Sequence, residues 1–134
     1  MKSTLVVGLA STKRITVDEG RCIGFMGKEG AVYATPRMVS DVEYTCRDFL
    51  LEHLDPGEDS VGAHVSIDHL APTPMGLAAT IELSVAEVDR RKVVFTFLVK
   101  DPLEEVGRGR HVRFVVDIAK TRERLAAKRA KAGL

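Results

Sequence analysis

The pattern of apolar and polar positions predicts one long helix in the first half of the chain, between residues 35 and 54. Apolar side chains recur every three or four residues along it and gather on one side: Val39, Val42, Cys46, Phe49 and Leu50. Pro36 suits the first helical turn, where its missing N–H costs no hydrogen bond, and Thr35 before it is a typical N-cap residue. Asp55-Pro56-Gly57 marks the end of the helix.

Four segments with β character follow the helix, at residues 60–70, 77–88, 92–100 and 106–118. Short links rich in proline, glycine and charged residues join them, and such links favour an antiparallel meander. A single long helix before several long strands predicts an α+β fold, in which a curved antiparallel sheet wraps around the central helix.

The first third of the chain is less regular. Residues 4–9 and 14–17 have β character and are separated by Ser11-Thr12-Lys13, which predicts a strand or a pair of strands at the edge of the sheet. Residues 20–30 contain four glycines and predict a loop that leads directly to the start of the helix. Such a loop is either a substrate lid over the helix N-terminus or an ordinary mobile connection.

Charge separates the end of the chain from the rest. The whole sequence has twenty basic and nineteen acidic residues, so no overall field attracts nucleic acid or membranes. Residues 1–118 are expected to form a single domain, and residues 119–134 a basic helical tail. Between 119 and 131 there are six basic residues, one acidic residue and no aromatic residue. This composition indicates a solvated helix, or alternatively one that offers charge to a phosphate-bearing ligand.

The cysteines and histidines show no metal or disulfide motif. Cys22 and Cys46 are too few for a disulfide framework, which indicates a reducing compartment. The apolar run at residues 5–10 is shorter than a secretory signal or a membrane span requires, so we expect a cytoplasmic protein. The histidines at 53, 64, 69 and 111 lie on different elements or faces. No phosphate-binding or dinucleotide motif occurs, so neither a metal nor a cofactor is expected.

Three residues could carry chemistry if the fold brings them together. Glu43 follows Val39 by one helical turn, so its carboxylate lies at the rim of the apolar stripe. Alternation in the 60–70 segment places His69 on its apolar face. With Thr35, these residues supply a hydroxyl, a carboxylate and an imidazole, which are the parts of a nucleophile or base arrangement for acyl transfer.

Each of these residues also has a purely structural interpretation. Thr35 could only cap the helix, and Glu43 could reach the edge of the stripe or pair with a nearby cation. His69 could be a core histidine bonded to a carbonyl, and Gly62, just before the apolar part of its strand, a turn glycine.

Several motifs in fixed order carry a family resemblance. They are Val32-Tyr33-Ala34-Thr35, Glu43 after seven further residues, the segment from Asp55 to Gly62, His69 with Ala71-Pro72-Thr73-Pro74-Met75-Gly76, and Gly107-Arg108-Gly109-Arg110-His111. Together they resemble the fluoroacetyl-CoA thioesterase-like family of hot-dog-fold proteins, over roughly residues 14 to 120.

The resemblance implies a hot-dog fold, an obligate homodimer with active sites at the dimer interface, and hydrolysis of an acyl-CoA thioester to the free acid and coenzyme A. Coenzyme A enters as part of the substrate, and no other cofactor is implied. Thr35, Glu43 and His69 match the catalytic residues of the family, and Gly62 matches a glycine near the thioester carbonyl. Tyr33 and Phe25 are the expected substrate contacts besides Gly62.

One stretch departs from the family. The aromatic residues that close the acyl pocket in the fluoroacetyl-selective member correspond here to Gly27-Lys28-Glu29-Gly30-Ala31, and Phe25 and Met26 are the only large apolar residues nearby. Selectivity for a fluorinated acyl group is therefore not expected. Two alternatives to the thioesterase also remain open: a hot-dog hydratase acting on an enoyl thioester, and a non-catalytic acyl-CoA-binding dimer.

Overall fold

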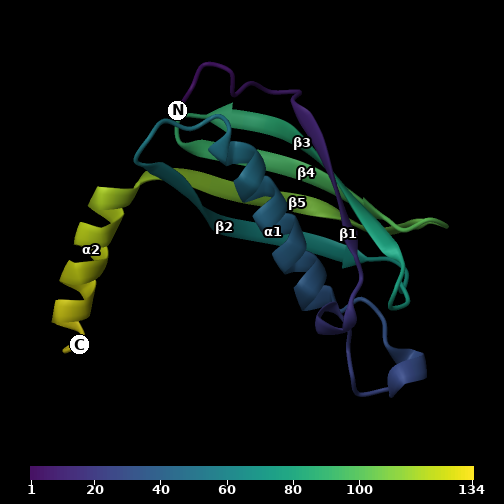
Figure 1. Ribbon diagram of the computed structural model, residues 1–134. Coiled ribbons are helices and arrows are strands. Elements are labelled where there is room, and N and C mark those ends of the chain that lie inside the picture. Colours follow the sequence, from purple (N-terminus) through teal and green to yellow (C-terminus); the bar gives the residue numbers. More distant parts are fainter.

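The computed structural model describes residues 1–134 and contains two α-helices and one five-stranded sheet (Figure 1). The elements are β1 (Ala10–Thr16), α1 (Thr35–Leu51), β2 (Glu58–His69), β3 (Ala78–Asp89), β4 (Lys92–Lys100), β5 (Glu105–Asp117) and α2 (Ile118–Lys131). Every pair of neighbouring strands is antiparallel, in the order β1-β3-β4-β5-β2. The predicted α+β architecture, with one long helix against a curved sheet, is confirmed.

Helix α1 lies across one face of the sheet (Figure 1) and buries most of the predicted apolar stripe, although Val39 and Phe49 are only half-buried and Met38, which the prediction did not include, is fully buried. Met38, Val42, Cys46 and Leu50 have no exposed surface and belong to the same core cluster as Phe95 of β4. Burial of this stripe provides most of the free energy that holds the helix in place, because a helix of this length is marginal in isolation. It also fixes which helix residues face β2.

Both ends of α1 differ from the prediction. Ala34, not Thr35, is the N-cap residue, and Thr35 is the first residue of the helix. No side chain caps the helix there, so the hydroxyl of Thr35 is free for another partner. The helix ends at Leu51, and the next residues form turns before β2.

The predicted edge strand is present as β1, but its predicted bounds were wrong. Residues 11–13 do not interrupt a strand but form the middle of β1, where Ser11 pairs with Leu83 and Lys13 with Ile81. Residues 4–9 form turns instead. The polar residues are tolerated because β1 is an edge strand with a mostly exposed surface, where backbone pairing with β3 and not side-chain burial holds the strand.

Strand β2 forms the opposite edge of the sheet and pairs only with β5. Val65, Ile67 and His69 share its half-buried face, as the alternation predicted. A bulge between Gly62 and His64 shifts the pairing register. Residues 61–64 are exposed, and the outer edge of the strand has no partner within the chain.

Gly109 allows β2 and β5 to approach closely. A Cβ atom at this position would lie 1.9 Å from the carbonyl oxygen of Ser66 and 2.8 Å from Cζ of Phe97. No side chain fits there without moving the backbone of β2, which explains one glycine of the Gly-x-Gly-x-His motif in steric terms.

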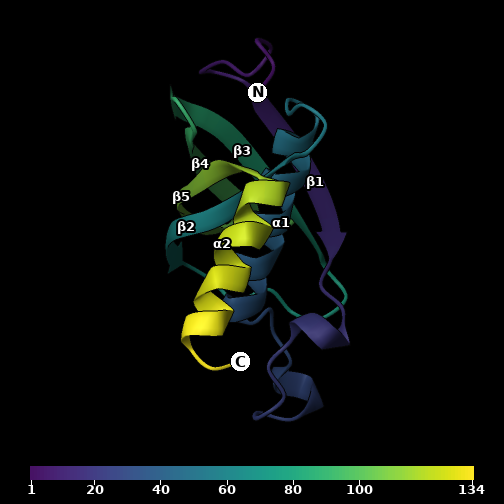
Figure 2. The same ribbon diagram turned by 90° about the vertical axis from the view of Figure 1, so that its left-hand side faces the viewer.

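Helix α2 continues directly from β5 and has no buried residue. Asp117 is its N-cap and accepts a hydrogen bond from the backbone N–H of Lys120. Figures 1 and 2 show that α2 extends away from the sheet, beyond the level of β2. Neither helix combines the length and the hydrophobicity that crossing a membrane would require.

Candidate active site

Two of the three predicted site residues meet at the start of α1. The Oγ1 atom of Thr35 lies 2.7 Å from Nδ1 of His69, a hydrogen bond between the first residue of α1 and the last residue of β2. The contact depends on the helix beginning at Thr35, because a hydroxyl that capped the helix would be turned toward backbone N–H groups instead. The structure therefore excludes a capping role for Thr35.

The other ring nitrogen of His69, Nε2, is buried and has no hydrogen-bond partner in the protein. Burial lowers the pKa of the imidazole below its ordinary value of 6.5, and a contact with the Ala71 backbone acts in the opposite direction. His69 is therefore neutral at pH 7, with one nitrogen bonded to Thr35 and the other without a hydrogen-bond partner. An imidazole in this state can accept a proton from a reacting group.

A mostly apolar pocket of about 410 Å³ surrounds the Thr35–His69 pair. Its wall comes from the end of β2 and from the segment before α1: Ile23, Phe25, Val32, Tyr33, Ala34, Leu70, Ala71 and Pro72. The glycine-rich loop thus borders the pocket, as the lid interpretation requires. The side chain of Phe25 is 83% exposed, so it borders the pocket without closing it.

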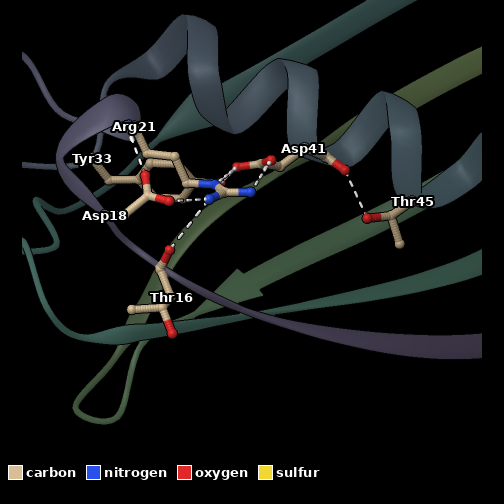
Figure 3. Close-up of polar contacts among 6 residues, drawn as sticks. All are labelled: Thr16, Asp18, Arg21, Tyr33, Asp41 and Thr45. Atoms are coloured by element: carbon tan, nitrogen blue, oxygen red, sulfur yellow. Dashed lines mark hydrogen bonds and ion pairs between the residues drawn. The ribbon is translucent and has the colours of Figure 1, made fainter.

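A buried polar cluster joins this loop to α1 (Figure 3). The hydroxyl of Tyr33 donates to Oδ2 of Asp41 at 2.5 Å, and Arg21 donates to both oxygens of the same carboxylate at 2.9 and 3.2 Å. Arg21 also contacts Asp18 at 2.8 Å. Asp41 is thereby shared between the helix and the segment that precedes it.

This cluster holds Tyr33, which also lines the pocket, by its hydroxyl. The residue is only 1% exposed, and its hydroxyl is directed at Asp41. Burial and the hydrogen bond to Asp41 both raise the pKa of Tyr33, so the phenol stays protonated and keeps donating to the carboxylate. Tyr33 supports the pocket wall from behind and fixes the backbone that leads to Thr35.

Glu43, the third predicted residue, lies elsewhere in the chain, beside Gly62 of β2. A Cβ atom on Gly62 would lie 3.0 Å from Oε1 of Glu43, 3.3 Å from Cε1 of His111 and 3.5 Å from Nη1 of Arg113. Glycine is thus what allows the carboxylate to approach β2. Glu43 is half-buried and forms no ion pair, so the nearby guanidinium contributes charge without a direct bond.

The sequence interpretation did not find the polar group next to Glu43. Arg113 is 5% exposed and donates to Oγ and O of Ser60, both at 2.8 Å, while its Nη1 lies 3.1 Å from Nε2 of His111. His111 is fully buried and its Nδ1 lies 2.8 Å from the carbonyl oxygen of His64. Burial lowers the pKa of His111, which keeps it neutral beside the arginine. The alternation of His111, Arg113 and Val115 on one face was the available signal.

The three predicted residues thus form two groups within one chain. Thr35 bonds to His69, whereas Glu43 has no contact with either. Eight residues of α1 separate Thr35 from Glu43, which corresponds to roughly 12 Å along the helix axis. A single chain therefore holds the hydroxyl and imidazole at one place and the carboxylate at another.

The Asp41 cluster leads to a prediction about stability. Asp41→Ala should lower the free energy of unfolding by about 2 kcal/mol, because the buried hydroxyl of Tyr33 and the half-buried guanidinium of Arg21 lose their acceptor. Asp48→Ala is the matched control: it removes an exposed aspartate without a partner from the same helix and should cost about 0.5 kcal/mol or less. Urea denaturation followed by circular dichroism measures both, and equal losses would contradict a role for the cluster in stability.

Comparison with known proteins finds similarity to a thioesterase of known name. A fluoroacetyl-CoA thioesterase from Streptantibioticus cattleyicolor is 34% identical over 89 residues, which is 66% of this chain and 64% of the relative. The aligned part therefore spans slightly less than two thirds of that relative's length.

Solved structures agree with this assignment. The fluoroacetyl-CoA thioesterase superposes with a TM-score of 0.84 at 27% identity, over 92% of this chain and 97% of the other. A variant of it in complex with fluoroacetate and CoA superposes with a TM-score of 0.79 at 28% identity, over 87% and 99% of the two chains.

A hot-dog-like protein from Thermanaerovibrio acidaminovorans shares the fold, with a TM-score of 0.84 at 23% identity over 91% of each chain. The fold is thus the hot-dog fold that the sequence predicted. Residues 17–119 match the model of the fluoroacetyl-CoA-specific thioesterase family, and the chain therefore belongs to that family.

Proposed function

We propose that this protein hydrolyses an acyl-CoA thioester to the free acid and coenzyme A. The observation that carries the proposal is the 2.7 Å contact between Thr35 and His69 beside an apolar pocket, in a chain of this family. The pocket can take an acyl group, and the pair provides a hydroxyl and a neutral imidazole next to it.

The chemistry requires that the carbon–sulfur bond break and that the elements of water be added. In the proposed reaction, the carboxylate of Glu43 either attacks the thioester carbonyl itself or accepts a proton from the attacking water. His69 moves the proton, and Thr35 hydrogen-bonds to the reacting groups. As the first residue of α1, Thr35 also has a backbone N–H without an intrahelical acceptor, which suits the oxyanion that forms on the carbonyl. The thiolate of coenzyme A leaves.

A second copy of the chain would bring Glu43 to the Thr35–His69 pair. The carboxylate must be close to the reacting carbon, and one chain holds it roughly 12 Å away along α1. If the two-fold axis of the dimer is perpendicular to α1, the two α1 helices run in opposite directions and the first turn of one can lie near the middle of the other. The proposed site therefore takes Thr35 and His69 from one copy and Glu43 from the other.

The free edge of β2 supports this dimer. It is twelve residues long, pairs only with β5 and exposes residues 61–64. An unpaired edge of this length is a template for pairing with another strand. Antiparallel pairing of two copies of β2 would continue the sheet across the dimer and place Gly62 and Glu43 at the interface.

The proposed acyl group is not restricted to fluoroacetyl. Residues 27–31 carry no aromatic side chain, and exposed Phe25 leaves the pocket open. Hydrolysis consumes only water, so the proposal includes no cofactor besides the coenzyme A of the substrate. It also includes a cytoplasmic location, which two free cysteines support, since oxidising compartments favour disulfides.

The first test is release of coenzyme A, measured with a thiol-reactive dye, from acyl-CoAs that range from acetyl to long-chain and aryl. Glu43→Gln should lower kcat at least about 100-fold, because the amide neither attacks nor accepts a proton. Glu52→Gln, an exposed glutamate after the end of α1, is the matched control and should keep wild-type activity. Full activity of Glu43→Gln would remove Glu43 from the mechanism.

The same assay separates the two alternatives. A hydratase would hydrate an enoyl-CoA reversibly without releasing thiol. A binding protein would bind acyl-CoA saturably and release none.

The pH dependence should report His69. Because burial lowers the pKa of this imidazole, protonation requires a pH below its ordinary value of 6.5. We expect kcat/KM to be constant above about pH 6.5 and to fall at lower pH as the imidazole loses its ability to accept a proton. His53→Ala, which removes a histidine just after the end of α1 opposite Thr35, should keep this acidic limb. A limb with its midpoint above pH 7 would contradict the assignment.

Mixed dimers test whether the site crosses the interface. A dimer of one Glu43→Gln chain and one His69→Ala chain retains one complete site if Glu43 acts on the other copy, so activity should return to about half of wild type. Each variant alone should stay inactive. Two different affinity tags, used in sequence, isolate the mixed dimer. An inactive mixed dimer of correct mass would show that Glu43 acts within its own chain.

A further inference from the structure

Helix α2 carries a concentration of unpaired positive charge that the proposed reaction does not use. Six of its side chains are basic and one is acidic: Lys120, Arg122, Arg124, Lys128, Arg129 and Lys131 against Glu123. All seven are exposed, and none of the six cations takes part in an ion pair or a side-chain hydrogen bond. By contrast, Arg21, Arg47, Arg91 and Arg108 all have carboxylate partners.

The rest of the chain has the opposite charge. Residues 1–117 contain fourteen basic and eighteen acidic residues, so the net charge of +1 depends entirely on α2. A substrate with several phosphate groups would therefore be repelled by the domain and attracted by this helix. Coenzyme A has this character, since its diphosphate and 3′-phosphate lie at the end of the molecule opposite the thioester.

Four of the cations form one stripe. Lys120, Arg124, Lys128 and Lys131 follow one another by four, four and three residues, so they project from the same side of α2. Lys120 and Arg124 also line a hollow of about 220 Å³ between α2 and the sheet, together with Arg91, which pairs with Glu58. Arg122 and Arg129 lie on another side of the helix.

Within one chain, α2 cannot reach the pocket beside His69. The helix follows Asp117, which pairs with Glu58 at the first residue of β2, whereas His69 is the last residue of the same strand. Twelve residues of strand separate these ends by roughly 36 Å. Figure 1 shows the same separation: α2 lies at one end of the sheet, and the loop before α1 lies at the other.

The proposed dimer removes this separation. Antiparallel pairing of two β2 strands places the first residues of one beside the last residues of the other. The α2 helix of the second copy then emerges near His69, two strand spacings or roughly 10 Å to the side. Figure 1 shows α2 extending past the level of β2, at the end of the sheet where β2 begins. With fourteen residues it reaches roughly 21 Å in that direction.

We propose that the Lys120–Arg124–Lys128–Lys131 stripe binds the diphosphate and 3′-phosphate of the acyl-CoA whose thioester lies in the site of the other copy. The proposal rests on the proposed function and its dimer. It makes α2 a determinant of substrate affinity, acting on the part of the substrate that does not react. Such contacts lower KM for the CoA ester and leave kcat nearly unchanged.

The test compares two double variants and two substrates. Arg124→Ala/Lys128→Ala removes two charges from the stripe, and Arg122→Ala/Arg129→Ala removes two from the other side of the same helix. Because α2 buries no residue, both should fold as wild type. The stripe variant should raise KM for an acyl-CoA about tenfold, through two lost charge-assisted contacts, with kcat nearly unchanged. The control variant should change KM less than twofold.

The second substrate is the same acyl group on N-acetylcysteamine, which lacks the nucleotide and all phosphates. Its KM should be equal in wild type and both variants. Equal KM values for acyl-CoA in wild type and the stripe variant would overturn the proposal and leave the hydrolase standing. The phosphates would then have to bind cations of the same copy, such as the exposed Arg37. An equal increase in KM in both double variants would show that only the total positive charge of α2 matters. That result would also overturn the proposal.

Mixed dimers decide which copy supplies the helix. With His69→Ala in one chain, only the site that uses His69 of the other chain can work. The stripe variant should raise KM when it is in the His69→Ala chain and have no effect when it is in the other. The reverse result would overturn the crossed arrangement.

Isothermal titration calorimetry tests binding of the phosphates by α2 independently of hydrolysis. If no acyl-CoA is hydrolysed, the role of the helix can still be tested by comparing the binding of coenzyme A with that of pantetheine, which lacks the nucleotide. Tighter binding of coenzyme A that the stripe variant abolishes would support the nucleotide site although the proposed hydrolysis had failed. No binding of coenzyme A would overturn both.

Discussion

The arrangement of the molecule depends on the burial of one side of α1 against the sheet. Met38, Val42, Cys46 and Leu50 lose all contact with solvent, and this burial fixes the rotation of the helix about its axis. The rotation in turn directs Glu43 at Gly62 and brings the first turn of the helix to the end of β2. The proposed roles of Thr35 and Glu43 depend on this rotation, because turning the helix by one residue would point both side chains away from β2.

The same periodicity made the architecture predictable from the sequence. The stripe identified α1, and the alternation in β2 placed His69 on the correct face. The edge strand β1 was predicted with the wrong bounds because its residues are held by pairing with β3, which leaves no apolar alternation. Thr35 was assigned a capping role because propensity describes the backbone of one helix and contains no information about a histidine thirty-four residues later.

Polar groups that act through long-range contacts were the least predictable part of the site. Arg113 occupies a strand position where a hydrophobic residue would be usual, and its burial is stabilised by Ser60 and His111. Asp41 is on the side of α1 that the helical pattern marks as polar, yet it accepts from Tyr33 and Arg21. Apart from His111, which precedes Arg113 by two residues in β5, their partners come from other segments, so the alternation in β5 was the one local signal. Both clusters fix backbone next to predicted site residues.

The separation of Thr35 and Glu43 on one rigid helix is the physical reason for the proposed dimer. A helix cannot bend by roughly 12 Å to bring its own residues together, whereas an antiparallel copy achieves this without strain. The same two-fold relation turns a tail that points away from its own pocket into a neighbour of the other one. In the proposed dimer, a single symmetry operation would therefore bring together the long helix, the free strand edge and the projecting basic helix of two copies.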